Sequence, residues 1–275
     1  MPELTGNAAS GTPTWVDLGI PDPGRAMDFY GALFGWEFEV GPPETGGYTM
    51  CLLRGEPVAA LMRNHDPDAT SFWWNLYFAT DDCDDTAARV GDAGGTIIAA
   101  PMDVMEQGRM AIATDPTGGQ FGLWQGRAHT GSRIVNEPGS LFWNELVTPD
   151  SDTALTFYEK VFGYELESVP DPDFDYTALK VGGRSVAGLY PVPEAPAAWS
   201  VYFAVEDADA AAHRAAEAGG TAQAPFDSPY GRISVITDPA GAEFRVMTST
   251  ETSEEATADT TAGITTDTAA ETAGF

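Results

Sequence analysis

Basic residues are scarce in this sequence. Only 13 lysines and arginines stand against 42 aspartates and glutamates, which gives a net charge of −29. A surface of this sign repels phosphate backbones and anionic membranes. The composition therefore argues against nucleic acid or a lipid surface as a partner, and it indicates a soluble, self-repelling protein.

Cysteines and long apolar runs are also scarce. Cys51 and Cys83 are the two cysteines, and they form neither a disulfide framework nor a metal-binding spacing. No apolar run approaches the length of a membrane span, and the first residues lack the basic and apolar regions of a signal peptide. These absences predict a cytoplasmic protein with reduced thiols.

Several catalytic and cofactor motifs are missing as well. No G-x-G-x-x-G or P-loop stands behind a predicted strand, so nucleotide binding has no support. No nucleophile elbow is present. The histidines number three, His65, His129 and His213, and we expect each to be solvated.

A long internal repeat is the main positive feature of the chain. Residues 28–39 read DFYGALFGWEFE, and residues 156–167 read TFYEKVFGYELE, 128 positions later. The Tyr-Phe-Ala of residues 77–79 returns at 202–204. A repeat of this length is a duplicated module, which allows each position to be compared with its twin.

The repeat and the composition divide the chain into five segments. We predict a polar leader at 1–12, a first module at 13–127, a connector at 128–140, a second module at 141–247 and a tail at 248–275. The tail is rich in Thr, Ala, Glu and Asp and has no basic residue. Such a segment cannot bury enough apolar surface to offset its ordering entropy, so we expect it to be disordered.

Hydrophobic spacing and turn residues predict the same elements in both modules. In the first module, one helix begins after Asp22 and ends at Gly35, and a second covers 84–93. The predicted strands of that module are 14–20, 37–40, 48–53, 57–62, 74–79, 96–100, 110–114 and 120–124. The order β-α-β-β-β thus occurs twice per module and four times per chain. The predicted fold class is α+β, with cupped, mostly antiparallel sheets.

These motifs resemble those of the vicinal-oxygen-chelate superfamily, which includes glyoxalase I, bleomycin-resistance proteins and extradiol dioxygenases. The resemblance covers about residues 13–247. It rests on Asp22 with residues 28–36, on the Tyr-Phe-Ala strands, and on the Asp-Pro-x-Gly turns at 115–118 and 238–241. The Trp-x-Asp/Glu-Leu segments that begin at Trp15 and Trp143 further resemble a bacterial branch of tandem glyoxalase-like proteins.

The resemblance implies a divalent metal ion on the concave face of a sheet, held by His or Gln, by His and by Glu. The matching positions, for the first module and then the second, are Trp15, Asn75, Gly122, Trp143, Ser200 and Arg245. Apart from the amide these are not normal metal ligands, and an arginine repels a cation. We therefore predict no standard metal centre and no cofactor, while a divalent ion held by atypical ligands such as Asp17 or Glu145 stays open.

Two acids are the candidate catalytic residues. Side chains alternate along a strand, so Trp15 shares a face with Asp17, and Trp143 shares a face with Glu145. A carboxyl buried beside an aromatic wall gains a raised pKa and becomes suited to proton transfer. The alternative is that each acid caps a backbone N–H or pairs with Arg109 or Arg232, and that the tryptophans fill the core.

Further side chains are candidates for ligand contacts. Tyr77 and Tyr202 either donate to a ligand oxygen or fill the pleat of the sheet. Arg109 and Arg232 either grip a ligand carboxylate or, as we expect in so acidic a chain, serve an internal partner. The candidate ligand-binding residues are Trp15, Tyr77, Arg109, Trp124, Trp143, Tyr202, Arg232 and Arg245.

Three functions stay open at this point. We favour a glyoxalase-like enzyme, of lyase, isomerase or hydroxylase-labelled type, that lacks the standard metal ligands. The second is a binding protein of the bleomycin-resistance type, with a cationic or aromatic small-molecule or antibiotic guest. The third is a metal-dependent glyoxalase or dioxygenase with atypical ligands. We expect a small-molecule ligand and a monomer or homodimer, and the sequence does not identify the active module.

Overall fold

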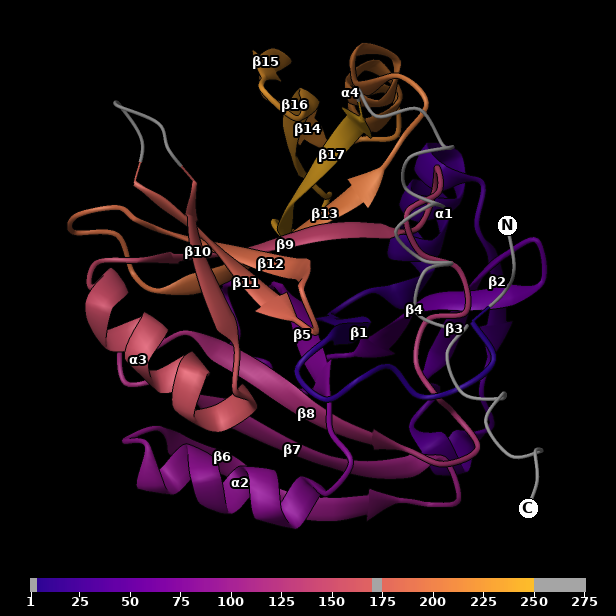
Figure 1. The fold of residues 1–275 in the computed structure, drawn as a ribbon. Helices are drawn as coiled ribbons and strands as arrows, with labels where there is room; N and C mark the ends of the chain where they lie inside the picture. Colours follow the sequence, from indigo (N-terminus) through magenta and orange to yellow (C-terminus); the bar gives the residue numbers. More distant parts are fainter. Residues whose placement is uncertain (1–3, 170–174, 250–275) are drawn as a thin grey trace, which may run out of the picture.

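The computed structural model describes residues 4–169 and 175–249, which form two large sheets with four α-helices (Figure 1). The predicted tail falls outside these ranges from residue 250 on. No helix in the described ranges is long and apolar enough to cross a membrane.

The first module contains two helices, eight strands and one short 3-10 helix. Its α-helices are α1 (Pro23–Phe34) and α2 (Cys83–Asp92), and its 3-10 helix is η1 (Pro43–Thr45). Its strands are β1 (Pro13–Ile20), β2 (Glu37–Val40), β3 (Thr49–Leu53), β4 (Glu56–Arg63), β5 (Trp74–Ala79), β6 (Thr96–Val104), β7 (Gly108–Thr114) and β8 (Gln120–Gly126).

The second module repeats this plan with one additional short strand. Its helices are α3 (Ser151–Phe162) and α4 (Ala208–Glu217). Its strands are β9 (Leu141–Thr148), β10 (Glu165–Val169), β11 (Tyr176–Val181), β12 (Arg184–Pro191), β13 (Ala198–Ala204), β14 (Thr221–Ala222), β15 (Phe226–Ser228), β16 (Gly231–Thr237) and β17 (Glu243–Ser249).

Both sheets have the same strand order. It runs β2-β3-β4-β1-β5-β8-β7-β6 in the first sheet and β10-β11-β12-β9-β13-β17-β16-β14 in the second, where β15 pairs with β16. The parallel neighbours are β1 with β4, β5 with β8, β9 with β12 and β13 with β17, and the other pairs are antiparallel. Each β-α-β-β-β unit contributes half a sheet, which confirms the predicted α+β fold with two tandem modules.

Local sequence explains where the first helix of each module begins and ends. Asp22 and Asp150 precede α1 and α3, and each side chain accepts a hydrogen bond from the backbone N–H three residues further on. Gly35 and Gly163 follow these helices with φ angles of 72° and 71°. Glycine adopts this left-handed conformation without steric cost, so the predicted helix ends are confirmed.

Alternation along the strands gives each sheet two different faces. On β1, Val16 and Leu18 belong to the main core, which both modules share, whereas Trp15 belongs to a separate cluster on the other face. We call this other face the first cup, and its cluster consists of Trp15, Ala60, Tyr77 and Trp124. The second cup carries the cluster of Tyr202, Ile233 and Met247, with Phe142 and Trp143 packed against it.

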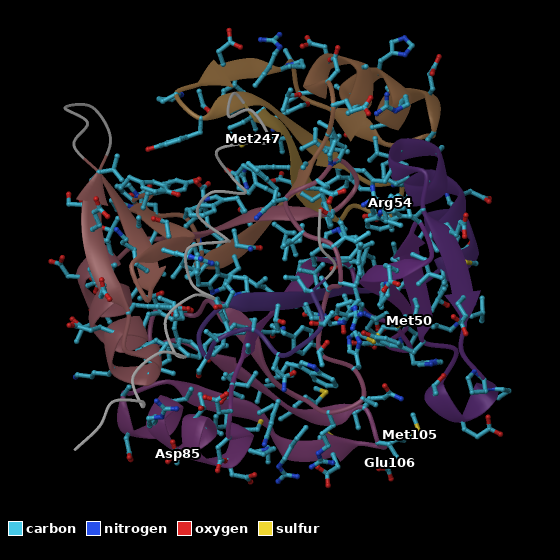
Figure 2. The ribbon with its side chains drawn as sticks, turned by 45° about the vertical axis from the view of Figure 1, so that its right-hand side comes forward. Met50, Arg54, Asp85, Met105, Glu106 and Met247 are labelled. Carbon is cyan, nitrogen blue, oxygen red and sulfur yellow. The ribbon has the colours of Figure 1, made fainter. Side chains whose placement is uncertain are left out.

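The modules pack against each other through their helices. Helix α1 of the first module contacts α4 of the second, and α2 contacts α3 (Figure 1). The cups face away from this shared core. Met50 packs in the first cup and Met247 in the second, and both are labelled in Figure 2.

Candidate functional site

Asp17 lies within the first cup and is almost fully buried, with 3% of its surface exposed. Strand β1 places it directly opposite Asn75 of β5, whose amide donates to Oδ1 at 2.9 Å. Tyr48, at the start of the β3 hairpin, donates its hydroxyl to Oδ2 at 3.2 Å. Within the described residues, the partners of Asp17 are thus an amide and phenols, and not the backbone N–H or the arginine that the sequence left open.

Burial raises the pKa of Asp17 from 3.8 to about 6, because the carboxylate loses its water shell. Hydrogen bonds from Asn75, Tyr77 and Tyr48 oppose this shift, since they favour the charged form. Burial and the nearby Asp17 carboxylate raise the pKa of both phenols, which therefore stay protonated. The cup thus holds one carboxyl that titrates near neutral pH beside two permanent hydrogen-bond donors.

The wall of the first cup is aromatic, and the connector covers part of it. The Trp15 indole donates to the Tyr48 hydroxyl at 2.9 Å, and the Trp124 indole donates to the backbone oxygen of His129 at 2.9 Å. The His129 ring meets Trp15 edge-on, with 4.3 Å between the ring centroids. Burial lowers the pKa of His129 to about 4. The expectation of a solvated His129 is therefore wrong, because the connector folds back over the aromatic face.

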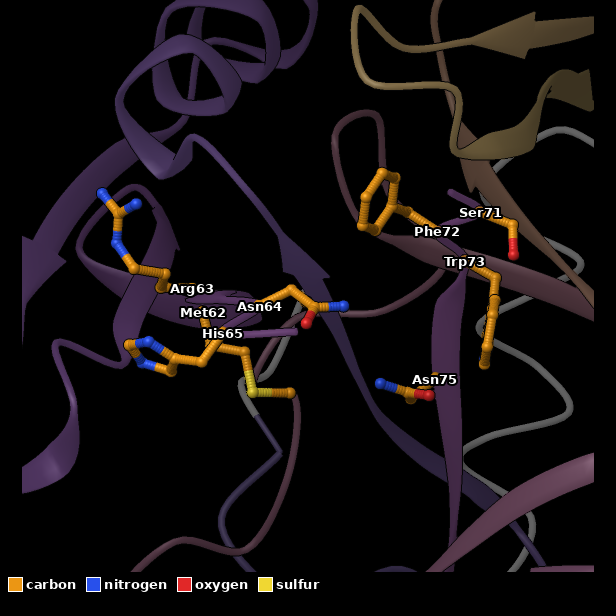
Figure 3. Close-up of a pocket in the computed structure, with 9 residues that line it drawn as sticks. Met62, Arg63, Asn64, His65, Ser71, Phe72, Trp73 and Asn75 are labelled. Atoms are coloured by element: carbon orange, nitrogen blue, oxygen red, sulfur yellow. The ribbon is translucent and has the colours of Figure 1, made fainter. Parts of the chain in front are cut away.

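A cavity of about 270 Å³ opens at one end of the first cup. The segment that follows β4 and the segment that leads into β5 form its two sides (Figure 3). Asn64 and Asn75 point from these sides toward the space between them, and Phe72 and Trp73 supply its apolar part. Since Asn75 donates directly to Asp17, the cavity is separated from this carboxyl by one side chain.

The second cup repeats the arrangement of an acid and its phenols. Tyr176 donates to Oε1 of Glu145 at 2.9 Å and accepts from the indole of Trp143, also at 2.9 Å. Tyr202 donates to the other oxygen, Oε2. Glu145 is only partly buried, in contrast to its almost fully buried twin in the first cup. The two acids therefore have similar partners and different access to solvent.

One pair of twin positions gives the cups different charges. In the first cup Gly122 stands beside Tyr77, and a Cβ atom added to this glycine would lie 2.1 Å from the tyrosine ring. In the second cup Arg245 takes the place of the glycine, and its guanidinium carbon lies 5.4 Å from the ring centroid of Tyr202. Tyr77 therefore fills the space that a side chain at 122 would need, whereas Tyr202 carries a cation on its ring face.

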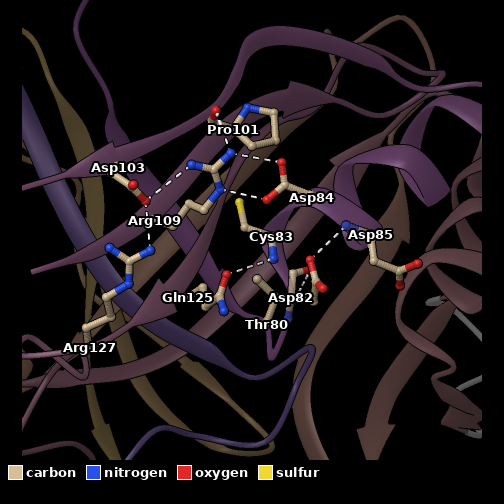
Figure 4. A network of polar contacts seen from close by, with 10 residues as sticks. All are labelled: Thr80, Asp82, Cys83, Asp84, Asp85, Pro101, Asp103, Arg109, Gln125 and Arg127. Atoms are coloured by element: carbon tan, nitrogen blue, oxygen red, sulfur yellow. Dashed lines mark hydrogen bonds and ion pairs between the residues drawn. The ribbon is translucent and has the colours of Figure 1, made fainter.

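Arg109 is held within its own module. Its guanidinium donates to both oxygens of Asp84, at 2.7 and 2.8 Å, and to Asp103 at 3.2 Å (Figure 4). The expected internal partner of Arg109 is thus a pair of surface aspartates, and the structure does not place this arginine against Asp17.

Arg232 repeats this arrangement in the second module. It donates to both oxygens of Asp209 and, at 2.9 Å, to Asp227. The structure therefore does not bring Arg232 to Glu145 either. Two of the three predicted ligand-binding arginines, Arg109 and Arg232, thus have bidentate carboxylate partners away from the acids of the cups.

Sequence reasoning named Tyr77 and Tyr202 as possible donors, but it missed the other two tyrosines that bind the acids, Tyr48 and Tyr176. Tyr48 and Tyr176 occupy twin positions in the repeat, and this recurrence was the available signal. Phenols are not among the ligands that the family resemblance implies on these strands, so the recurrence carried no functional meaning before the structure was known. The segment from Asn64 to Trp73, which lines the cavity, has no periodicity that would predict its path.

Family models match both modules. Residues 12–123 match the Glyoxalase/Bleomycin resistance protein/Dioxygenase superfamily, and residues 143–247 match a Glyoxalase-like domain. Two relatives cover most of the chain. "Putative glyoxylase CFP32" of Mycobacterium tuberculosis is 45% identical over 246 residues, which are 86% of this chain and 94% of that protein. "Anthracycline biosynthesis protein DnrV" of Streptomyces peucetius is 38% identical over 259 residues, 87% of this chain and 94% of that protein.

Solved structures share the fold at lower identity. The 2,3-dioxygenase LapB from Pseudomonas sp. KL28 superposes with a TM-score of 0.64 at 16% identity, covering 88% of this chain and 93% of that one. The Mn(II)-bound glyoxalase from Novosphingobium aromaticivorans gives a TM-score of 0.63 at 20% identity, covering 86% and 82%.

Proposed function

This chain belongs to the Glyoxalase/Bleomycin resistance protein/Dioxygenase superfamily, and we propose that it is a glyoxalase-like enzyme that moves a proton on a small carbonyl compound. Asp17 is the proposed acid and base, and the cavity beside Asn75 is the proposed entrance. One observation supports this assignment: a buried carboxyl with a pKa of about 6 lies one hydrogen bond away from an open cavity. A catalytic group works best when its pKa lies near the operating pH.

The proposed step is an isomerisation that needs no oxidant or reductant. The substrate takes the place of the Asn75 amide at Oδ1 of Asp17. The carboxylate then accepts a proton from the carbon beside the carbonyl group, and the electron pair of the broken C–H bond forms an enolate. With a 2-hydroxyketone this enolate is an enediolate, and the phenols of Tyr48 and Tyr77 donate hydrogen bonds to its two oxygens. The hydroxyl proton passes to the former carbonyl oxygen, and the carboxyl returns its proton to the former carbonyl carbon, which leaves the new carbonyl group on the carbon that lost its hydrogen.

The family resemblance also implies a metal ion, but the residues at the implied positions do not fit one. The nitrogen of Trp15 carries a hydrogen that it donates to Tyr48, so it has no free lone pair for a metal. Gly122 offers no donor atom, and the ring of Tyr77 occupies the space beside it. In the second cup the corresponding position is a cation, Arg245.

The described residues offer no alternative ligand set. In residues 4–169 and 175–249, no group of three or more His, Cys, Asp and Glu side chains is placed to hold a metal ion. We therefore propose that the reaction uses no metal at the positions implied by the family, and we derive no step through one. Elemental analysis of protein purified without tags or chelators is expected to find much less than one divalent ion per chain.

The twin acids allow a matched test of this function. Turnover of a panel of 2-oxoaldehydes, 2-hydroxyketones and aromatic carbonyl compounds would be followed for the wild type, Asp17→Asn and Glu145→Gln. General acid–base catalysis contributes about 100-fold or more, so Asp17→Asn should lose at least that much in kcat. Glu145→Gln makes the equivalent change in the other cup and should keep turnover. Full activity of Asp17→Asn would remove Asp17 from the mechanism.

Non-catalytic capture of an aromatic molecule is the second candidate. The apolar side of the cavity, formed by Phe72 and Trp73, favours it, and so does the name of the Streptomyces relative, which comes from anthracycline biosynthesis. In this case an aromatic compound would quench the fluorescence of Trp73 and raise the melting temperature without being converted. Asp17→Asn would then bind the compound as tightly as the wild type does.

A further inference from the structure

We propose that the two modules together form a binding site for a small alkylguanidinium cation, at the place where helix α2 ends beside the start of helix α3. The site is a cavity of about 360 Å³, and none of its lining residues belongs to the cavity beside Asn75. Three observations support it: the charges around the cavity, its apolar wall, and an arginine at the equivalent place between the other two helices.

Both modules contribute to the cavity. The first module supplies Ala93 and Gly94, which directly follow α2, and Pro116, from the turn after β7. The second module supplies side chains from the first two turns of α3, among them Asp152, Thr153 and Phe157. Helices α2 and α3 contact each other (Figure 1), so the cavity forms only when the modules are packed together.

The charges around the cavity favour a cation. Asp152 lines it with a carboxylate that no ion pair engages within residues 4–169 and 175–249. The carbonyl groups at the end of α2 add a partial negative charge. The start of α3 has a partial positive charge of about half a unit, but Asp150 and Asp152 place two full negative charges there. Hydrogen bonds from Thr153 lower the pKa of Asp150, so this carboxyl is ionised at neutral pH.

The basic side chains of the two helices do not neutralise this charge. Arg89, in the last turn of α2, pairs with Asp85 at 3.2 Å and donates to the Thr86 hydroxyl at 2.7 Å, so its guanidinium is directed back along the helix. Lys160 lies in the last turn of α3, at the far end from the cavity. A cation bound in the cavity therefore meets a carboxylate that these helices leave unneutralised.

The other interface between the modules holds a guanidinium at the equivalent place. In the repeat, Arg25 of α1 is the twin of Thr153. Gly219, which follows α4, is the twin of Gly94. A Cβ atom added to Gly219 would lie 3.9 Å from Nη2 of Arg25, whereas one added to Gly94 would lie 3.7 Å from the ring of Pro116. Arg25 thus brings a cation to the end of α4, and the shorter threonine brings none to the end of α2.

These contacts define the class of ligand. A planar guanidinium can donate to both oxygens of Asp152 from one edge, which an ammonium group cannot do. Ala93, Pro116 and Phe157 supply apolar surface for a short alkyl chain, as apolar side chains do for the stem of an arginine. In the described ranges no group of three or more His, Cys, Asp and Glu side chains is placed to hold a metal ion. The cavity therefore suits an alkylguanidinium better than a metal ion, which needs several oxygen ligands.

Two-dimensional NMR titration with n-propylguanidinium tests the site, with the neutral n-propylurea as the control ligand. The backbone amide signals of Gly94 and Thr153 should shift and reach saturation. The amide signal of Gly219 should stay in place, because Arg25 already lies beside this glycine. Propylurea should bind at least about threefold more weakly, since it cannot form the ion pair with Asp152.

Three variants locate the interaction. Asp152→Asn should weaken propylguanidinium binding at least about threefold. Glu159→Gln removes the same charge from an exposed position of the same helix and should leave the affinity unchanged. Thr153→Arg supplies a guanidinium from the chain itself, as Arg25 does in the other interface, and should abolish the ligand-dependent shift of Gly94.

The same spectra show whether each variant is folded, and the comparison of the two ligands on the wild type does not depend on any variant. Asp17→Asn should bind propylguanidinium as the wild type does, which separates this site from the proposed reaction. Equal affinity of the wild type and Asp152→Asn, equal binding of propylurea, equal shifts of Gly94 and Gly219, or no saturable shift would overturn the proposal.

Discussion

The hydroxyl of Tyr30, in the first module, donates to Oδ2 of Asp238 in the second module, 208 residues further along the chain. The oxygens are 3.1 Å apart, and both side chains are buried. The twin pair runs in the opposite direction, from Tyr158 of the second module to Asp115 of the first, at 2.9 Å. Two motifs that carry the family resemblance, Phe-Tyr and Asp-Pro-x-Gly, therefore join the modules to each other.

This pairing predicts a specific energetic coupling between the modules. Tyr30→Phe leaves Oδ2 of Asp238 buried without its donor, and it removes the acceptor of the Trp74 indole N–H, so it should lower the free energy of unfolding by about 1–3 kcal/mol. In double-mutant cycles measured by urea unfolding, Tyr30→Phe should couple to Asp238→Ala by about 1 kcal/mol.

Asp115→Ala is the matched control for this cycle, because the partner of Asp115 is Tyr158. Tyr30→Phe and Asp115→Ala should be additive within about 0.5 kcal/mol. Equal coupling of Tyr30 to both aspartates, or coupling to neither, would contradict the crossed pairing.

The raised pKa of Asp17 predicts how stability changes with pH. Folding raises this pKa from 3.8 to about 6, so the folded chain binds more protons than the unfolded chain between these values. The stability that the group contributes is present at low pH and is lost as the pH rises through the folded pKa. Asp17→Asn cannot ionise, so its free energy of unfolding relative to the wild type should increase by about 2–3 kcal/mol between roughly pH 4 and pH 8.

Asp84→Asn is a control for which the predicted change of stability with pH has the opposite direction. The hydrogen bond from Arg109 lowers the pKa of Asp84, so the stability from Asp84 is present above its unfolded pKa and is lost as the pH falls. Denaturant unfolding at several pH values would measure both variants. If the difference in unfolding free energy between Asp17→Asn and the wild type did not change with pH, folding would not raise the pKa of Asp17.

Protonation of the buried His129 should lower the free energy of unfolding at acidic pH. Burial lowers its pKa from 6.5 to about 4, so its contribution is present above the higher value and is lost as the pH falls toward the lower one. As the pH falls between these two values, the free energy of unfolding of His129→Gln should decrease by about 1–3 kcal/mol less than that of the wild type. His213→Gln, at an exposed position of α4, is the matched control variant. If the stability of His129→Gln fell at acidic pH as much as that of the wild type, the connector would not cover the first cup.

Gly122 should not tolerate a side chain. The Cβ atom of Gly122→Ala would lie 2.1 Å from the ring of Tyr77, and this overpacking should cost about 1–3 kcal/mol of unfolding free energy. Gly91→Ala, in helix α2 with open space around its Cβ position, should instead stabilise the chain by about 0.5–1 kcal/mol. Opposite signs in thermal unfolding would confirm the packing, and a neutral Gly122→Ala would contradict it.

The features that sequence predicted well depend on short-range rules. The helix ends at Gly35 and Gly163 follow from local backbone preferences, and the shared face of Trp15 and Asp17 follows from the two-residue period of a strand. The repeat then extended each assignment to its twin. These rules do not require knowledge of which strands are neighbours.

The features that sequence did not predict depend on distant pairing. Tyr48 directly precedes β3, which lies two strands away from the β1 strand of Asp17, and that strand order is set by the packing of the whole module. Arg109 donates to Asp84, at the start of α2, because this helix packs beside β7. No local sequence pattern specifies this packing. The path of the connector over Trp15, through His129, is likewise a tertiary outcome.

The pH dependence of kcat/KM most directly tests Asp17 as the proton-transfer group. The measurement would use chelator-treated protein and the best substrate from the carbonyl panel. The wild type should show one ionisation at about pH 6 that the Asp17→Asn variant lacks, and it should keep its activity after chelation. A profile without this ionisation, or activity that chelation abolishes and a divalent metal restores, would contradict the assignment.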